Sequence, residues 1–234
     1  MTSTDRRKGN WTARLGRRLD NAVPPGRRLP DRQPAYVRSW IYVFGVATLA
    51  ALLFVLASGF ALAIGGTTWW HTSAVGHFLN SVHLWSVELF FVCMTIHLWG
   101  KFAMAAWRGG RALTWITGAV AFVGSIGTAF TGYLSQTNFD SQWISTQAKD
   151  GLNAVGIGAF FNVLNPGQML LWHIVLLPSV LGVLVVLHVI LVRRKGVVPP
   201  IDAEPPAREL PSRPLESRPA VPSTPAETPT RRQP

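Results

Sequence analysis

The chain has 234 residues, of which 48% are hydrophobic, and a formal net charge of +11. Charged residues are absent from long stretches and gather toward both ends, a distribution that excludes an ordinary soluble domain with evenly spread charge. The same distribution argues against nucleic acid as the partner of the basic residues.

The first 38 residues are basic and contain four prolines. Within them, Trp11, Leu15, Leu19 and Val23 recur at helical spacing among arginines. Such a pattern is typical of an amphipathic helix that lies on an anionic membrane surface. A disordered cytoplasmic arm is an equal alternative for this N-terminal segment.

Four apolar segments follow, at about 39–64, 80–104, 114–134 and 168–192. Each is long enough to cross a bilayer core, which requires about 20 residues per helix. The first is too long for a signal peptide and lacks a small-residue cleavage site behind it, so we expect it to stay in the membrane. The sequence therefore predicts an all-α membrane protein built as a bundle of four transmembrane helices.

The distribution of Lys and Arg predicts the orientation of this bundle. Of the 22 basic residues, ten lie at or before Arg38, three lie between the second and third segments, and eight follow the fourth. Only Lys149 lies on the opposite side. Because positive residues collect in cytoplasmic segments, we expect both termini in the cytoplasm and a multi-pass protein of the plasma membrane.

Two regions lie outside the segments that cross the membrane. The connection over about 135–167 is long enough to contain short helices, and Asp140 could cap one of them. Residues 193–234 are rich in proline and are expected to form a disordered cytoplasmic tail. The central domain is accordingly expected to span residues 39–192.

Six histidines are present, and four of them lie in the apolar segments. His71 and His77 are expected in a short outer loop. His83 and His97 lie 14 residues apart in the second segment, whereas His173 and His188 lie 15 apart in the fourth. Fourteen residues make about 3.9 helical turns, so the two histidines of one segment face nearly the same side of their helix at two membrane depths.

This spacing predicts two metal centres, each with two imidazole ligands. His83 would pair with His173 at the outer level, and His97 with His188 at the inner level. Two axial imidazoles leave a haem iron without an open position, which suits electron transfer. A zinc site would need three or four ligands at one depth. The lone Cys93 excludes a CxxCH attachment site, so we expect no haem bound covalently through one.

Four glycines on the other two helices repeat the same spacing. Gly45 and Gly59 lie 14 residues apart in the first segment, as do Gly118 and Gly132 in the third. Glycine permits a flat macrocycle to approach the helix backbone, and we predict that role for these positions. Tight helix–helix packing through small residues is the alternative.

The extra residue between His173 and His188 predicts an irregular helix. At about 100° per residue, 15 steps turn the second histidine away from the direction that 14 steps give. Pro178 lacks an N–H and frees the carbonyl of Ile174, which permits a kink or a π-bulge. We expect irregular backbone between about 174 and 182, eased by Gly182.

Several stretches, together with the paired histidines and glycines, are similar to one known family. These stretches are Ser81–Trp85, Leu113–Gly118, Thr131–Tyr133, His173–Pro178 and Arg193–Gly196. Over about residues 36–200 the chain resembles the N-terminal half of cytochrome b, and most closely the short cytochrome b6 form. The resemblance implies two b haems, a quinone or quinol substrate, and a place in a quinol-oxidising respiratory complex.

The resemblance also implies partners. They are a second membrane subunit that completes the quinol site, a Rieske-type iron–sulfur protein, a cytochrome c or equivalent acceptor, and membrane lipid. A homodimer within the complex is left open, and so is whether the chain counts as an enzyme or only as an electron-transfer subunit. Two alternatives remain: a di-haem membrane anchor between the quinone pool and a peripheral dehydrogenase or reductase, and a transporter or scaffold without haem.

The chain departs from the family at several positions. Val43 stands where cytochrome b6 places a cysteine for an extra covalent haem, and residues 134–140 replace a Leu-Pro-Trp motif that shapes the outer quinol pocket. Asn80 and Gly100 replace two arginines, so Lys101 becomes the nearest candidate partner for haem propionates. Glu88, the one acid in an apolar segment, is either an interhelical contact or a proton or quinone contact.

Overall fold

The computed structural model describes residues 11–22 and 39–200, and all regular structure within them is helical. The elements are α1 (Trp11–Ala22), η2 (Trp40–Tyr42), α3 (Val43–Thr72), α4 (Ala74–Ala103), α5 (Ala112–Leu134), α6 (Phe139–Ala154), α7 (Pro166–Leu171), η3 (Trp172–Leu176) and α8 (Leu177–Lys195). The predicted all-α class is therefore confirmed.

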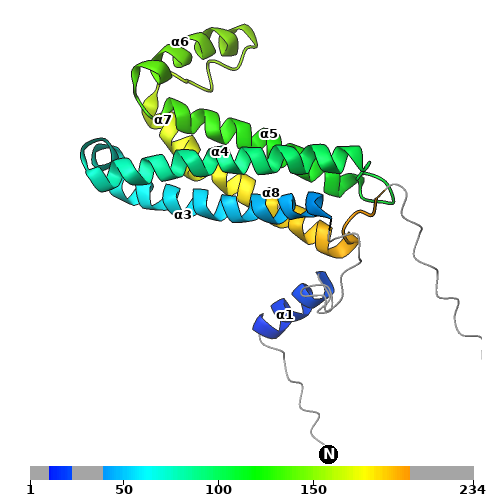
Figure 1. Ribbon diagram of the computed structural model, residues 1–234. Helices are drawn as coiled ribbons and strands as arrows, with labels where there is room; N and C mark the ends of the chain where they lie inside the picture. Colours follow the sequence, from blue (N-terminus) through cyan, green and yellow to red (C-terminus); the bar gives the residue numbers. More distant parts are fainter. Residues whose placement is uncertain (1–10, 23–38, 201–234) are drawn as a thin grey trace, which may run out of the picture. The chain divides into compact units, whose positions relative to one another are not determined.

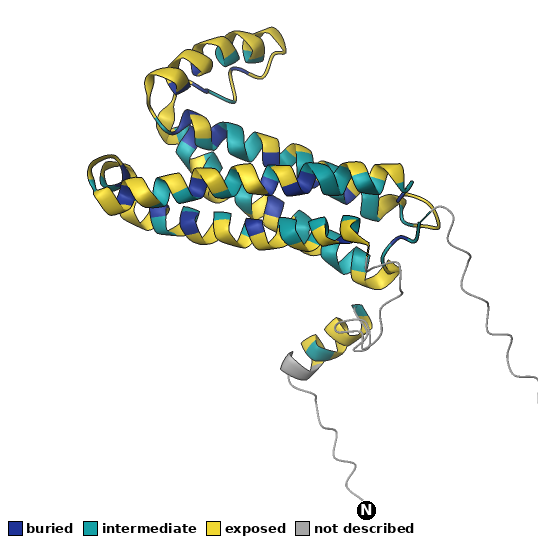
Figure 2. Cartoon of the chain, viewed as in Figure 1, coloured by how far each residue is buried: buried dark blue, intermediate teal, exposed yellow. Residues whose placement is uncertain are grey.

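Four stretches are long and apolar enough to cross a membrane: Trp40–Thr72, Ala74–Ala103, Ala112–Leu134 and Pro166–Lys195. Large apolar side chains on their outer sides are exposed, for example Phe60 (70%) and Val183 (69%), as Figure 2 shows along each helix. Water would penalise so much exposed apolar surface, whereas lipid would not. The four expected transmembrane helices are thus present.

The four long helices pack as two pairs, α3 against α4 and α5 against α8, with fewer contacts between the pairs (Figure 1). Two hydrogen bonds tie the elements together at one end of the bundle. The Tyr42 hydroxyl donates to the carbonyl of Val198 (2.8 Å), and the Arg111 guanidinium donates to the carbonyl of Lys195 (3.2 Å). The start of α3, the start of α5 and the end of α8 therefore lie at the same end.

The connection between α3 and α4 differs from the expected outer loop. Helix α3 breaks at Gly66, whose φ of +78° is unfavourable for other residues, but helical backbone continues to Thr72. Ser73 then caps α4 by accepting a hydrogen bond from the Gly76 N–H (3.3 Å). His71 consequently lies in the last turn of α3 and His77 in the first turn of α4, not in a loop.

The long connection after α5 contains a helix, α6, as the sequence predicts. Its cap is Asn138 and not Asp140, because the Asn138 side chain accepts from the Ser141 N–H (2.8 Å). Asp140 lies inside the first turn, where its negative charge suits the positive end of the helix dipole.

The fourth span is interrupted by a π-helical segment, η3 (Trp172–Leu176), which is followed by regular helix from Leu177. The predicted irregularity is therefore present, although it begins two residues earlier than expected and includes His173 itself. Pro178 lies in the first turn of α8, where a missing N–H is tolerated. Gly182 lies in regular helix and takes no part in the irregularity.

The described N-terminal segment forms α1, in which Leu15 and Leu19 are exposed on an amphipathic helix. Its placement on a membrane surface stays a prediction. Val23 and residues 201–234, which include most of the predicted disordered tail, lie outside the described residues.

Candidate functional site

The four histidines of the apolar segments occupy two helices that face each other. His83 and His97 lie on α4, whereas His173 lies in η3 and His188 in α8. His83 is buried, and the other three are half-buried. In the described residues no group of three or more His, Cys, Asp or Glu side chains converges, so the histidines are arranged in pairs and not in a zinc-like cluster.

The structure brings His83 and His173 together. Their ring centres lie 6.1 Å apart, and the ring planes are nearly perpendicular at 84°. Two imidazoles that share one metal through bonds of about 2.0 Å hold their ring centres about 6 Å apart. The spacing of the two rings is therefore that of two axial ligands on one iron. The other two histidines of the predicted pairs, His97 and His188, lie on the same two sides of the bundle, on α4 and α8.

Each histidine ring lies against one of the four predicted glycines. A Cβ built on Gly45 would lie 3.0 Å from His97 Cε1, and one on Gly59 would lie 3.0 Å from His83 Cε1. On the other helix pair, Gly118 lies in the same way against His188, and Gly132 even closer against His173. These glycines therefore make room for the imidazoles that pack across each helix pair.

The orientation of the rings is the same in all four contacts. Cε1 is the ring atom nearest to the glycine, and Nε2 is the farthest of the three ring atoms in contact. In three of the rings Nδ1 is also taken up by a neighbouring oxygen atom. This arrangement leaves Nε2 as the nitrogen available to a ligand between the helix pairs.

Backbone carbonyls on α5 fix two of the rings. His173 Nδ1–H donates to the carbonyl of Thr128 (2.8 Å), and His188 Nδ1–H donates to the carbonyl of Thr114 (2.9 Å). Each carbonyl belongs to the residue four positions before the contacting glycine. A carbonyl can only accept, so Nδ1 carries the proton and Nε2 keeps its lone pair. Metal-bound histidines commonly make this bond through the second nitrogen.

A serine hydroxyl accepts the hydrogen bond from Nδ1 of His83. The Ser58 hydroxyl donates its proton to the carbonyl of Phe54 (2.7 Å) and lies 3.0 Å from His83 Nδ1. Since that proton is already used, the oxygen accepts from Nδ1–H. Thr117 likewise directly precedes the glycine that contacts His188, and its hydroxyl oxygen lies 3.2 Å from His188 Nδ1.

His97 is the exception among the four. Its Nδ1 is buried and has no hydrogen-bond partner. The residue before the contacting Gly45 is Phe44, whereas Ser58, Thr117 and Thr131 precede the other three glycines. An unpaired buried nitrogen is costly, and it distinguishes this ligand from the other three.

The haem that the sequence predicts fits these residues. The rings of His83 and His173 have a spacing that two ligands of one iron can adopt, three of the four rings keep Nε2 free to bind a metal, and the glycines leave room for all four rings. The sequence predicts that the glycines make room for a macrocycle. In the structure each of them contacts an imidazole ring, and this contact explains directly why no side chain is present there.

Lys101 lies in the last turn of α4, four residues after His97. Its ammonium lies 3.9 Å from the centre of the Tyr42 ring and 3.9 Å from the Met104 sulfur. Gly100 lies against Ile41, whose Cδ1 would be 2.5 Å from an added Cβ, so a long side chain could not replace it without rearrangement. Asn80 exchanges two hydrogen bonds with Gln136 (3.2 and 3.3 Å).

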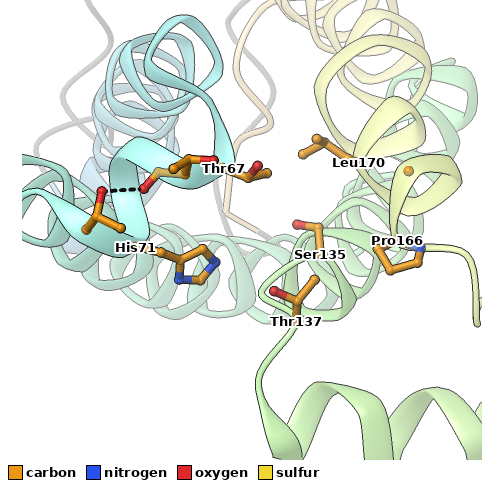
Figure 3. Close-up of a pocket in the computed structure, with 9 residues that line it drawn as sticks. Thr67, His71, Ser135, Thr137, Pro166 and Leu170 are labelled. Atoms are coloured by element: carbon orange, nitrogen blue, oxygen red, sulfur yellow. Dashed lines mark hydrogen bonds between the residues drawn. The ribbon is translucent and has the colours of Figure 1, made fainter.

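A cavity of about 560 Å³ opens at the end of the bundle that is predicted to lie outside (Figure 3). Three parts of the chain line it. They are α3 with Thr67 and His71, the turn after α5 with Ser135 and Thr137, and α7 with Pro166 and Leu170. Thr137 has a φ of +56°, which is rare for a β-branched residue. The cavity thus lies where residues 134–140 depart from the family pattern.

Sequence reasoning missed the residues that orient the rings. Ser58, Thr117 and the carbonyls of Thr114 and Thr128 were not predicted. One signal was available, since a Ser or Thr directly precedes three of the four glycines. The carbonyl partners carry no signal in the sequence, because every residue has a carbonyl.

The chain is similar to a family of known proteins. The family model described as cytochrome b(N-terminal)/b6/petB matches residues 88–218. A cytochrome bc complex cytochrome b subunit from Chlorobaculum thiosulfatiphilum is 31% identical over 137 residues, which cover 54% of this chain and 32% of the relative. Cytochrome b6 from Heliobacterium modesticaldum is 28% identical over 137 residues, which cover 54% of this chain and 64% of the relative.

A solved structure, the hyperthermophilic respiratory Complex III, has a chain with the same fold. The TM-score is 0.67 at 20% identity, over 85% of this chain and 57% of that one. The matched region thus makes up less than two thirds of each of these relatives.

Proposed function

The chain belongs to the cytochrome b(N-terminal)/b6 family, and from that premise we propose that it carries electrons across a membrane through two b haems. His83 and His173 would hold one haem iron, and His97 and His188 the other. The complex that it serves would be a quinol-oxidising one of the bc or b6f type.

The pairing of His83 with His173 carries this proposal. Two rings from helices on opposite sides of the bundle stand 6.1 Å apart, with their Nδ1 atoms already bonded to Ser58 and to the carbonyl of Thr128. A b haem with two imidazole ligands supplies a one-electron redox centre that has no open coordination position.

The protein's own residues would hold and tune these centres. Gly59 and Gly132 permit the two rings of the first pair to lie close to the neighbouring helices, and Gly45 and Gly118 do so for the second pair. The hydrogen bonds to Nδ1 set the tautomer and raise the basicity of Nε2. Lys101, whose ammonium lies beside Tyr42, would place its positive charge near the propionates of the second haem.

The partners that we propose come from the relatives. One relative is a subunit of a cytochrome bc complex by name, so we propose that this chain also assembles with other subunits. They would include a second membrane subunit, a Rieske-type iron–sulfur protein and a cytochrome c or equivalent acceptor. Quinol in the plasma membrane would be the electron donor.

Single and double histidine replacements test the pairing. In the full chain, His83→Ala and His173→Ala should each remove the same haem, and the double variant should lose no more than either single variant. Combining His83→Ala with His97→Ala should remove both. The readout is the reduced-minus-oxidised visible spectrum together with the haem content, and His71→Ala is the control.

The pairing fails if His83→Ala and His173→Ala remove different haems, because their losses would then add. It also fails if His71→Ala removes haem. A chain that contains no b haem would contradict the whole proposal and leave a non-haem scaffold instead.

A further inference from the structure

Glu88 is the one acidic residue in the four described spans, and it lies at the middle of its helix. Fourteen residues separate it from the start of α4 at Ala74, and fifteen from the end at Ala103. Its side chain is exposed, and it makes no hydrogen bond or ion pair with the described part of the chain. An ionisable group therefore stands unpaired at the depth where the membrane is most apolar.

Glu88 points away from the histidine side of α4. It follows His83 by five residues and precedes His97 by nine, so at about 100° per residue it is turned about 140° from the first and about 180° from the second. The buried residues Phe90 and Met94 lie on the histidine side of the helix. The carboxyl group thus faces outward and cannot contact a ligand between the helix pairs.

Several exposed residues lie on the same outward side of α4 as Glu88. We define the α4 stripe as Ser81, Trp85, Glu88, Val92 and Trp99, which follow one another at intervals of four, three, four and seven residues. All five are exposed, and the two tryptophans are exposed by 75% and 67%. The tryptophans lie about 21 Å apart along the helix, a length sufficient for packing of a second helix.

A lipid environment does not suit this stripe. A charged side chain at the centre of a transmembrane helix is costly, and such residues almost always face protein or water. A protonated carboxyl also needs a hydrogen-bond partner in hydrocarbon. Neither α3 nor the rest of the described chain provides one.

We propose that the α4 stripe binds a membrane-spanning helix of a partner subunit that presents a cationic or hydrogen-bond-donating side chain at the level of Glu88. Charge complementarity selects this occupant. A second copy of this chain, packed symmetrically on the same stripe, would bring Glu88 against another Glu88, and two ionised carboxylates repel each other. The inference does not depend on the haems, because the stripe and the histidines lie on opposite sides of α4.

Two substitutions at position 88 test the interaction in the intact complex, purified in mild detergent through a tag on the full chain. Glu88→Leu removes the acceptor, and Glu88→Gln retains an amide oxygen that can accept. We expect Glu88→Leu to lower the yield of one co-purifying membrane subunit about tenfold, and Glu88→Gln to lower it less. Val183→Leu on α8 is the control and should change nothing.

Haem content is measured in the same samples. It should be unchanged in both Glu88 variants, so a loss of the subunit with full haem content supports the docking surface separately from the proposed function. An unchanged subunit yield in Glu88→Leu would overturn the inference. A loss of haem in parallel would also overturn it, because Glu88 would then serve the bundle's own fold.

A photo-crosslinking residue placed at Trp85 identifies the occupant in native membranes. The expected adduct is with an apolar peptide of another subunit that contains Lys, Arg, Asn, Gln, Ser or Thr near the linked residue. Adducts with lipid alone, or with a second copy of this chain alone, would contradict the proposal.

Discussion

Gly132 lies so close to the His173 ring that an added methyl group would overlap it, and the other three glycines have the same relation to their histidines at 2.9–3.0 Å from Cε1. Real Cβ atoms do not come that near to a ring atom without displacement. A side chain at any of these positions must therefore move the imidazole that it meets.

Gly132→Ala should accordingly reduce the content of the haem that His173 holds, while membrane insertion stays normal. The control is Gly127→Ala on the same helix, because no atom lies within 4 Å of a Cβ at that position. Haem per inserted protein measures the effect. Equal haem content in the two variants would show that the contact with His173 can be relaxed at no cost.

The unpaired Nδ1 of His97 leads to a second prediction at the residue scale. Phe44 precedes Gly45 where Ser58 precedes Gly59, so Phe44→Ser should bring a hydroxyl to His97 Nδ1. A hydrogen bond there raises the basicity of Nε2 and favours the oxidised iron. The reduction potential of the haem that His97 holds should fall.

Phe44→Ala is the matched control, because it also removes the ring that packs against Trp40 but adds no hydroxyl. A potentiometric titration of the visible spectrum separates the two variants. If both shift the potential equally, the missing hydrogen bond is not the cause.

The sequence alone identified the histidines and the glycines, because both repeat at nearly the same helical spacing. It did not identify what each glycine contacts, since that depends on which helices pack together. The same limit explains the cap of α6: Asn138 and Asp140 are both good caps, and the path of the turn after Leu134 decides between them.

At the scale of the helices, the π-helical segment η3 explains how His173 and His188 can be 15 residues apart although His83 and His97 on α4 are 14 apart. An i→i+5 hydrogen bond takes one more residue per turn than the regular pattern does. Residue spacing therefore predicts that a distortion exists between His173 and His188. Its position could not be predicted, because Pro178 can be accommodated in the first turn of a new helix as well as by a kink.

Shortening the fourth span by one residue tests this explanation. With Pro178→Ala in the background, deletion of Val175 within η3 should permit a regular helix in which His173 and His188 lie 14 residues apart. Both haems should then be retained. Deletion of Val183 in the regular part of α8 should instead turn His188 by about 100° relative to His173 and lose one haem. Equal losses in the two deletions would contradict the role of η3.

The ends of α3 and α4 were also beyond sequence reasoning. The first apolar run ends near residue 64 and the second begins near residue 80, but helical backbone extends to Thr72 and starts again at Ala74. A single extended residue, Ser73, is sufficient for the reversal because Gly66 breaks α3 before it and the Ser73 side chain caps α4. Hydrophobicity marks where a helix crosses the membrane and not where it ends.

At the scale of the four-helix bundle, the contacts explain how two ligand pairs can be held between helices. Packing is most extensive within each helix pair, and the ligand rings lie across each pair against its glycines. The histidines therefore remain in place at the faces where the two pairs meet. The two histidines on α4 and the two on η3 and α8 correspond to the two centres that we propose.

The ratio of haem to protein in the purified full chain tests this central claim most directly. Extraction with acidified acetone followed by the pyridine haemochromogen assay, with protein measured by amino-acid analysis, gives the number of haems and shows whether any is covalently bound. The account predicts two b haems per chain, both extractable. One haem per chain, or none, would contradict it.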